Sequence, residues 1–160
     1  MAGFDRFAWP VPSRLVTASY FDPKYPDQFK KQHLGVDIHA PVGTEVVSPI
    51  TGKVVRAERG SKPGYSYIMI KEDNTGYHHV LGHVSVNGID KGVTRGKKLT
   101  TVIHFPDGGD HLHWGISRFY PKMDGETWGW GRAPVTATRI EAGQHGWLDP
   151  FLVNSVLYQV

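Results

Sequence analysis

Glycine and proline recur so closely along this chain that only short regular segments fit between them. The 160 residues include 19 glycines and 11 prolines, and proline opposes regular structure because it fixes φ and lacks a backbone donor. No long segment has apolar residues at helical spacing. We therefore predict an all-β fold, a small antiparallel sheet or sandwich around one core, in a single domain over residues 1–160 with long loops.

Three stretches carry the predicted strands. "GTEVVSPITGKVVRAE" (43–58) indicates a strand, a proline-containing turn and a second strand. "YSYIMIKEDNTGYHHVLGHVSV" (65–86) is typical of a hairpin, because "DNTG" is a favourable turn between two strand-like runs. "HLHWGISRFY" (111–120) is a further β-rich run.

Two regions are expected to be irregular. Residues 1–14 are predicted to be a lead-in, and four prolines oppose regular structure as far as about residue 30. Residues 118–148 are predicted to form a long loop region rich in aromatic residues. Loops of this length are usually functional or disordered, and the aromatic content argues against disorder.

Composition excludes several kinds of site and partner. There are no cysteines, so disulfides and cysteine-bound metals are excluded. The formal charge of +3 is modest, and no basic run with interleaved aromatic residues indicates nucleic acid. No apolar run is long enough to span a membrane. We expect neither a nucleic-acid partner nor membrane insertion.

Two of the nine histidines, His111 and His113, stand on either side of Leu112 directly after a Gly-Gly turn. Side chains at i and i+2 of a strand point to the same face. Both imidazoles are therefore expected on one face, where they offer nitrogen ligands for zinc. Such pairs also occur on surface strands without metal, so this one is only moderately specific.

A second cluster, "HLGVDIHAPVGTEV", places His33 and Asp37 four residues apart. Gly35 and the β-branched Val36 disfavour a helix, and an even spacing also keeps both side chains on one face of a strand. Two histidines and one aspartate leave the fourth tetrahedral position open, as catalytic zinc sites do. The H-x-x-x-D spacing alone is weak because it often occurs by chance.

A third cluster, "GYHHVLGHVS", contains three histidines. Strand parity places His79 and His83 on one face, which leaves these two as competing candidates for a site. The remaining histidines are expected to be solvated or hydrogen-bonded without a chemical role; they are His39, His78, His104 and His145.

Three blocks of the sequence, taken in order, resemble the signature motifs of the lysostaphin-type (LytM-like) zinc metallopeptidases. They are "HLGVDIHAPVGTEVVSPITGKVV", "GYHHVLGHVS" and "HLHWGI". The resemblance covers roughly residues 15 to 117, and three motifs in the right order make it specific. It implies a small antiparallel β-fold of the duplicated hybrid-motif type, with the site in a groove walled by loops. Members of that family cleave peptide bonds in bacterial peptidoglycan.

The resemblance also implies a role for each matching residue. His33, Asp37 and His113 would bind one zinc ion, and His83 and His111 would be the catalytic histidines beside it. Strand parity alone does not separate His111 from His113. No H-E-x-x-H glutamate is present, so an imidazole has to orient or deprotonate the attacking water. Which of His83 and His111 does so stays open.

The chain departs from the family pattern in ways that concern substrate preference more than metal binding. Asp110 directly precedes His111 within a shortened segment, and "VLGH" replaces the commoner tyrosine-containing approach to His83. The region after "HLH" is longer than the family pattern. Its aromatic residues either line the groove against glycan or stem peptide or bury the loop against the core; they are Tyr120, Trp128 and Trp130.

The sequence thus predicts a zinc-dependent peptidoglycan endopeptidase, a monomeric and bacteriolytic hydrolase that acts at the bacterial cell wall. The start of the chain lacks a basic stretch followed by an apolar one, so secreted, periplasmic and phage-delivered routes all stay open. The alternatives are a wall-binding or activator module of the same fold, a metal-dependent hydrolase for another substrate, and a lipoyl-carrier-like domain. Lys53 lacks the flanking pattern of a carrier lysine.

Overall fold

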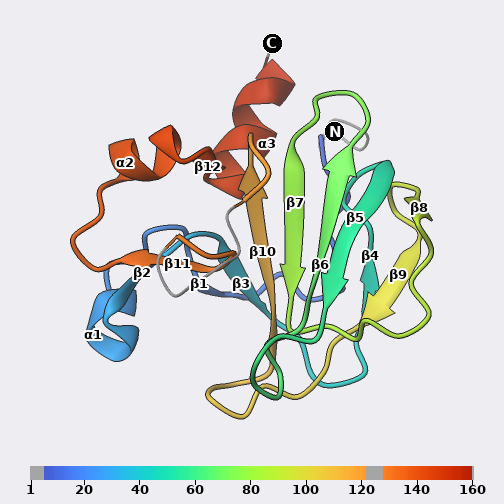
Figure 1. Ribbon diagram of the computed structural model, residues 1–160, viewed down its shortest axis with the longest axis horizontal. Coiled ribbons are helices and arrows are strands. Elements are labelled where there is room, and N and C mark those ends of the chain that lie inside the picture. Colours follow the sequence, from blue (N-terminus) through green and yellow to red (C-terminus); the bar gives the residue numbers. More distant parts are fainter. Residues whose placement is uncertain (1–5, 122–127, 160) are drawn as a thin grey trace.

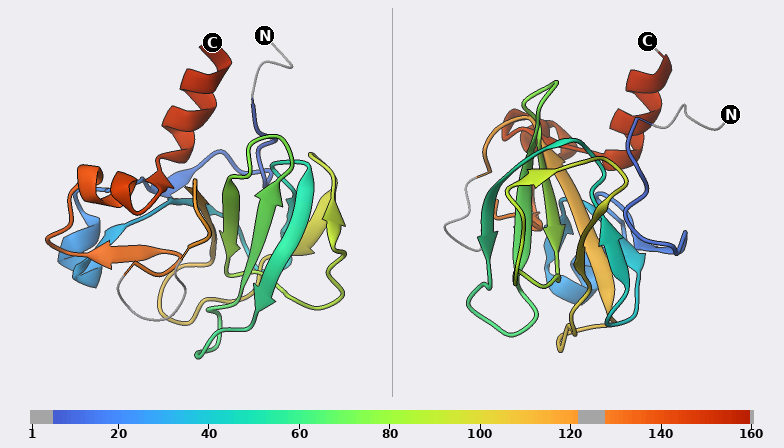
Figure 2. Two further views of the ribbon diagram at one scale, coloured as in Figure 1. Left: turned by 45° about the horizontal axis from the view of Figure 1, so that its top comes forward. Right: turned by 90° about the vertical axis from the view of Figure 1, so that its right-hand side faces the viewer.

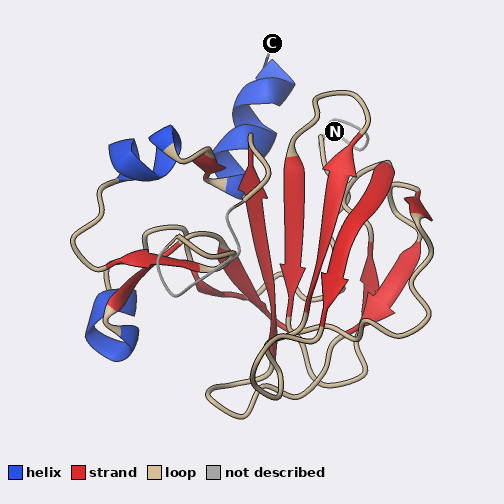
Figure 3. Cartoon of the chain, in the orientation of Figure 1, coloured by secondary structure: helices blue, strands red, loops and turns tan. Residues whose placement is uncertain are grey.

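A computed structural model gives the fold and describes residues 6–121 and 128–159. Strands make up most of the regular structure, and the helices of this part of the chain are short and lie at its edge (Figure 3). The strands pair antiparallel throughout. The predicted all-β, antiparallel fold class is therefore confirmed.

Eight strands of the described chain form the main sheet at the centre of the molecule (Figure 1). They are β1 (Val16–Ala18), β3 (Val36–His39), β5 (Gly52–Glu58), β6 (Tyr67–Glu72), β7 (His78–Gly82), β8 (Gly92–Val93), β10 (His111–Ser117) and β12 (Trp147–Leu148). Their spatial order is β1-β3-β10-β7-β6-β5-β8, and β12 pairs with β10. The strand β10, which carries the predicted histidine pair, therefore lies between β3 and β7.

Two small sheets and three helices complete the described structure. One sheet pairs β2 (Lys31–His33) with β11 (Arg132–Pro134), and the other pairs β4 (Glu45–Val47) with β9 (Lys98–Thr101). The helices are α1 (Tyr25–Phe29), α2 (Arg139–Gln144) and α3 (Pro150–Gln159). Both views in Figure 2 show α3 projecting from the sheet at the end where the N-terminal segment also lies. None of the helices in the described ranges is long and apolar enough to cross a membrane.

The predicted hairpin and strand breaks follow from local sequence. β6 and β7 pair antiparallel around the "DNTG" turn, where Gly76 has a φ of 73°, a conformation that glycine adopts without steric cost. The predicted strands at 43–58 and 111–120 are also present, as β4, β5 and β10. These predictions are confirmed.

The segment 118–148 is less irregular than expected. It contains β11, α2 and β12, because β11 finds a partner in β2 and Thr138 caps α2 by accepting a hydrogen bond from the Glu141 amide. Residues 122–127 of this segment lie outside the described residues. Within the predicted lead-in, residues 6–14 form no helix or strand, yet Phe7 and Val11 are buried in the core; residues 1–5 also lie outside the description.

Apolar side chains cover both faces of the main sheet. One face carries the larger core, which includes Ile68, Leu81, Leu112, Trp114 and Ile116. The opposite face carries a smaller cluster that includes Tyr67, Met69, Val80, Ala133 and Trp147. Because side chains alternate along a strand, His113 lies on the second face, beside the smaller cluster.

Candidate metal centre

The strand register brings His33, Asp37 and His113 together. Asp37 on β3 is directly opposite His113 on β10, so their side chains share one face of the sheet. His33 ends β2, which belongs to a different sheet, and the chain turns at Leu34 and Gly35 before β3 begins. We predicted that His33 and Asp37 share one face of a single strand. They instead lie on two strands that a tight turn connects.

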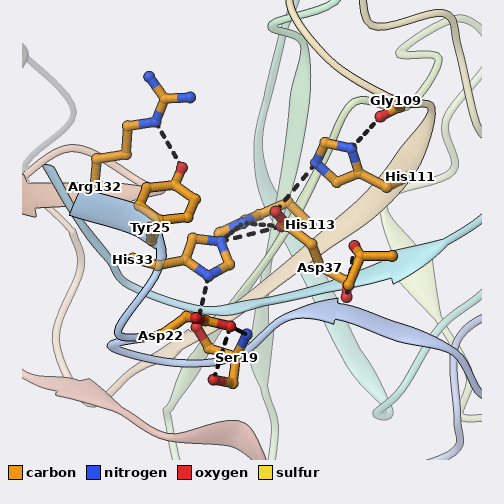
Figure 4. Close-up of polar contacts among 10 residues, drawn as sticks. Ser19, Asp22, Tyr25, His33, Asp37, Gly109, His111, His113 and Arg132 are labelled. Carbon is orange, nitrogen blue, oxygen red and sulfur yellow. Dashed lines mark hydrogen bonds and ion pairs between the residues drawn. The ribbon is translucent and has the colours of Figure 1, made fainter. Parts of the chain in front are cut away.

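Three electron-pair donors converge at this place (Figure 4). His33 Nε2 lies 3.1 Å from Asp37 Oδ1 and 3.2 Å from His113 Nδ1, and the last two atoms are 3.0 Å apart. All three residues are buried. Asp37 Oδ2 also lies 3.4 Å from Nε2 of His111.

The chemistry of these donors fits a bound cation. His33 donates its Nδ1 proton to the Ser19 carbonyl at 2.9 Å, which leaves a lone pair on Nε2 facing the Asp37 carboxylate. Three lone pairs aimed at one point repel unless a proton or a cation lies between them. A tetrahedral site with ligands at 2.0–2.1 Å has edges of about 3.3–3.4 Å, close to the observed triangle.

The charges support the same interpretation. Burial acts to raise the pKa of Asp37, but the neighbouring imidazoles of His33, His113 and His111 hold it well below its usual range. Burial lowers the pKa of His113, against the opposing effect of Asp37. At neutral pH the cluster is thus a carboxylate with a neutral His113 imidazole, the protonation states in which these groups bind metal.

His83 and His111 lie beside the triangle, with their ring centroids 4.6 Å apart. Each ring is oriented by one backbone carbonyl: His83 donates from Nδ1 to Gly64 and His111 donates from Nδ1 to Gly109, both at 2.6 Å. In the neutral tautomer that these contacts favour, Nε2 is the ring nitrogen with the lone pair. Burial, followed by the nearby His111, lowers the pKa of His83 to about 3, so this ring is neutral at physiological pH.

The competing candidate, His79, lies on the other side of the sheet. Its ring is fully buried in the larger core, where Trp114 Nε1 donates to its Nδ1 at 3.1 Å. Strand parity expected His79 and His83 on one face, and this is wrong. The chain leaves β7 at Gly82, and His83 has a φ of 66°, which turns its side chain away from the face that parity assigns.

The other histidines lie outside the triangle. His39 is exposed, and His78 is buried with Tyr120 at its edge. His104 pairs with Asp110 at 2.8 Å, and His145 stacks on Trp128. Asp110 also accepts the Phe105 amide at 2.9 Å. The unusual residue before His111 therefore closes the turn that leads into β10.

A groove of about 810 Å³ lies over the candidate metal centre. Its lining includes Asp37, His83, His111 and His113. Trp130 is also part of the lining, with its ring centroid 5.1 Å from that of His113. The other two aromatic residues of this region, Tyr120 and Trp128, are not among the described residues that line the groove.

Several groups around the centre belong to no recognisable sequence motif. Tyr25 in α1 stacks on the His33 ring at 4.4 Å, and Arg132 in β11 donates to the Tyr25 hydroxyl at 2.8 Å. The orienting groups of the histidines are backbone carbonyls of Ser19, Gly64 and Gly109. Any residue type supplies a carbonyl, so only the folded chain identifies them.

Comparison with solved structures finds the same fold in several known proteins. The chain is 29% identical to a zinc-containing peptidase from Vibrio cholerae (TM-score 0.54, covering 69% of this chain and 36% of that one). It is 28% identical to Helicobacter pylori Csd3 (TM-score 0.51, covering 69% and 29%). The catalytic domain of lysostaphin from Staphylococcus simulans shares the fold at 15% identity (TM-score 0.54, covering 98% and 93%).

The first two of these proteins are much longer than the matched region, so the chain corresponds to about a third of their length. No curated protein sequence matches the chain. The model of peptidase family M23 matches residues 31–125, more than half of the chain and all five histidine and aspartate positions described above. The predicted resemblance to lysostaphin-type metallopeptidases is thus confirmed, and the chain belongs to peptidase family M23.

Proposed function

We propose that this chain is a zinc-dependent endopeptidase that hydrolyses peptide bonds in bacterial peptidoglycan. The observation that carries the proposal is the convergence of His33 Nε2, Asp37 Oδ1 and His113 Nδ1 on one point at the floor of the groove. Membership of peptidase family M23 and 29% identity to a zinc-containing peptidase support it.

In this proposal His33, Asp37 and His113 would hold the metal beside the groove. A bound zinc ion would supply Lewis acidity, which polarises a carbonyl and lowers the pKa of water. The remaining work falls to side chains of the chain itself, because no glutamate is placed as in an H-E-x-x-H helix.

His83 and His111 are the candidates for proton transfer. Both rings keep Nδ1 protonated through a carbonyl partner, so each presents Nε2 as an acceptor. One neutral imidazole can take the proton of the attacking water and return it to the leaving amine. Until it returns that proton, the protonated ring can stabilise the negative oxygen of the tetrahedral intermediate.

The test is the release of soluble muropeptides from purified peptidoglycan, with and without a zinc chelator, followed by mass spectrometry. We expect release that stops with the chelator and returns when zinc is added back, and the new termini identify the cleaved bond. Zinc-loaded protein that binds several wall types but releases nothing from them would contradict the proposal and favour a binding module.

A further inference from the structure

The groove carries an excess of positive charge away from the candidate metal centre. Its basic lining residues are Lys31, Arg59, Lys62 and Arg132, and its acidic ones are Asp37 and Glu58. Asp37 is already engaged by histidines, and Glu58 by Arg56 and Tyr67. None of the four basic residues forms an ion pair with another described residue. Such a groove favours an anionic ligand.

The position of Arg132 follows from the register of the small sheet. Arg132 on β11 is directly opposite His33 on β2, and residues directly opposite in an antiparallel pair share a face. The next pair, Ala133 and Gln32, faces the other way, and Ala133 is buried in the smaller apolar cluster. Arg132 is therefore fixed on the same face as a candidate metal ligand.

Aromatic rings hold the Arg132 guanidinium in place. It lies 4.7 Å from the ring centroid of Phe29 and 5.6 Å from that of Tyr25, and its Nε donates to the Tyr25 hydroxyl at 2.8 Å. In Figure 4 the two terminal nitrogens point away from Tyr25. These two nitrogens are the fork that binds a carboxylate with two parallel hydrogen bonds.

Only one aromatic ring separates this fork from the candidate metal centre. Tyr25 stacks on His33 with its ring nearly parallel, at 4.4 Å and 18°, while its hydroxyl contacts Arg132. Among the other basic residues, Arg59 is hydrogen-bonded to Asn87, and Lys62 lies over Tyr65. Arg132 is the one of the four whose guanidinium is held by a ring that itself stacks on a candidate metal ligand.

We propose that Arg132 is a specificity-determining residue that binds a free carboxylate of the peptide substrate close to the scissile bond. The inference rests on the proposed peptidase function and narrows its substrate class. The substrate is an anionic peptide whose carboxylate lies next to the cleaved bond. An uncharged glycine bridge, which has no such group, is a poor ligand for this wall of the groove.

The experiment compares two peptidoglycan stem peptides of identical sequence, one with free α-carboxylates and one with those groups converted to carboxamides. Binding to the zinc-loaded full chain is measured by calorimetry. We expect the native protein to bind the carboxylate form about tenfold to a hundredfold more tightly, as for hydrogen bonds to charged groups. Arg132→Gln should lose most of that preference, and Arg132→Lys should keep part of it.

Arg139→Gln is the matched control. Arg139 lies near two aromatic rings, Tyr20 and Phe21, in the same way, but it belongs to α2 and does not line the groove. The Arg139→Gln substitution removes the same charge and should leave the preference for the carboxylate peptide intact. Melting temperature and zinc content are measured for every variant, so that misfolding of Arg132→Gln is recognised. If that variant misfolds, the preference of Arg132→Lys for the carboxylate peptide tests the inference instead.

Equal preference for the carboxylate form in the native and Arg132→Gln proteins would overturn the inference, as would a native protein that does not discriminate between the two peptides. The proposed peptidase function is tested separately, by cleavage of the wall. If no wall is cleaved while Arg132-dependent discrimination persists, the groove binds anionic peptides without hydrolysing them.

Discussion

The histidines at the site differ in which ring nitrogen is hydrogen-bonded to a backbone carbonyl. His33, His83 and His111 all use Nδ1 on a carbonyl and present Nε2. His113 is reversed: its Nδ1 faces Asp37 and His33, and its Nε2 is buried without a hydrogen-bond partner among the described residues. A carbonyl partner fixes the tautomer, so the backbone determines which ring nitrogen is presented by His33, His83 and His111, but not by His113.

Substitutions at the five positions should therefore separate into two groups. Alanine at His33, Asp37 or His113 removes a donor from the triangle, so we expect loss of zinc and of wall hydrolysis together. His83→Ala and His111→Ala leave all three donors in place, so activity should fall by about a hundredfold or more while most zinc is retained. Metal analysis of purified proteins, run alongside muropeptide release, checks this. Equal zinc loss in all five variants would contradict the division.

Gly35 should be intolerant of any side chain. A Cβ there would lie 2.5 Å from the Trp114 carbonyl oxygen and 2.7 Å from Cε1 of His113. Because the carbonyl belongs to a central strand, the turn at Gly35 and the His113 ring must move instead. We expect Gly35→Ala to lower the free energy of unfolding by about 1–3 kcal/mol and to weaken zinc binding.

Gly92→Ala is the control for this prediction, since a Cβ at Gly92 has no neighbour within 4 Å. Its stability should stay within about 0.5 kcal/mol of the native value in a urea titration. Unchanged stability and zinc affinity in Gly35→Ala would show that the turn adjusts and would refute the prediction.

Strand ends position three of the five candidate site residues, whereas Asp37 and His113 are paired inside β3 and β10. His33 is the last residue of β2, His83 follows the last residue of β7, and His111 is the first residue of β10. The interiors of β6, β7 and β10 are buried and supply a rigid base. Side chains at the ends can face a groove while the strands behind them stay fixed.

The two tryptophans of the segment 118–148 should behave differently. Trp130 lines the groove beside His83 and His113, whereas Trp128 stacks on His145 at 3.9 Å. We expect Trp130→Ala to weaken binding of soluble wall fragments about tenfold or more, with a smaller effect from Trp128→Ala. Trp128→Ala should instead lower the melting temperature. Calorimetry and thermal unfolding of both variants give the comparison, and equal binding losses would argue against it.

In the molecule as a whole, the candidate site and the larger hydrophobic core lie on opposite faces of the main sheet. The face with the smaller cluster holds the groove, and the opposite face holds the larger core. His79 lies in that core, where Phe7 and Trp114 surround it and its Nε2 has no partner among the described residues. A titratable group in this position affects folding and not the site.

Acid should therefore destabilise the fold through His79. Burial, followed by the charge of Arg6, lowers its pKa from 6.5 to about 3. Above pH 6.5 both folded and unfolded states are neutral at this ring, so its contribution is fully present. As the pH falls towards 3, only the unfolded state takes up the proton, and stability is lost by about 1.4 kcal/mol per pH unit.

The measurement compares urea unfolding of the native protein and His79→Gln at pH 7.5 and pH 5.0. The native protein should lose about 2 kcal/mol more between these two values than the variant does. If both proteins lose the same amount, the ring is not held neutral in the fold and the prediction is wrong.

Local sequence features were enough to predict the fold class and the candidate donors. Frequent glycine and proline limit segment length, and alternation places Leu112 opposite His111 and His113, as the core contact of Leu112 confirms. These are local properties, because strand periodicity and turn preference depend on neighbouring residues. The family resemblance added the order of the motifs, and the roles it assigns to the five residues stay predictions.

Other features of the site depend on contacts between residues far apart in the chain, which only the folded structure reveals. His33 meets His113 across 80 positions, and Arg132 reaches the groove only because β11 pairs with β2. The segment 118–148 forms regular elements for the same reason, since a strand needs a partner that local sequence does not name. His83 left the face that parity assigns because a single positive φ follows β7, and such a backbone reversal at a non-glycine residue is fixed by the surrounding packing.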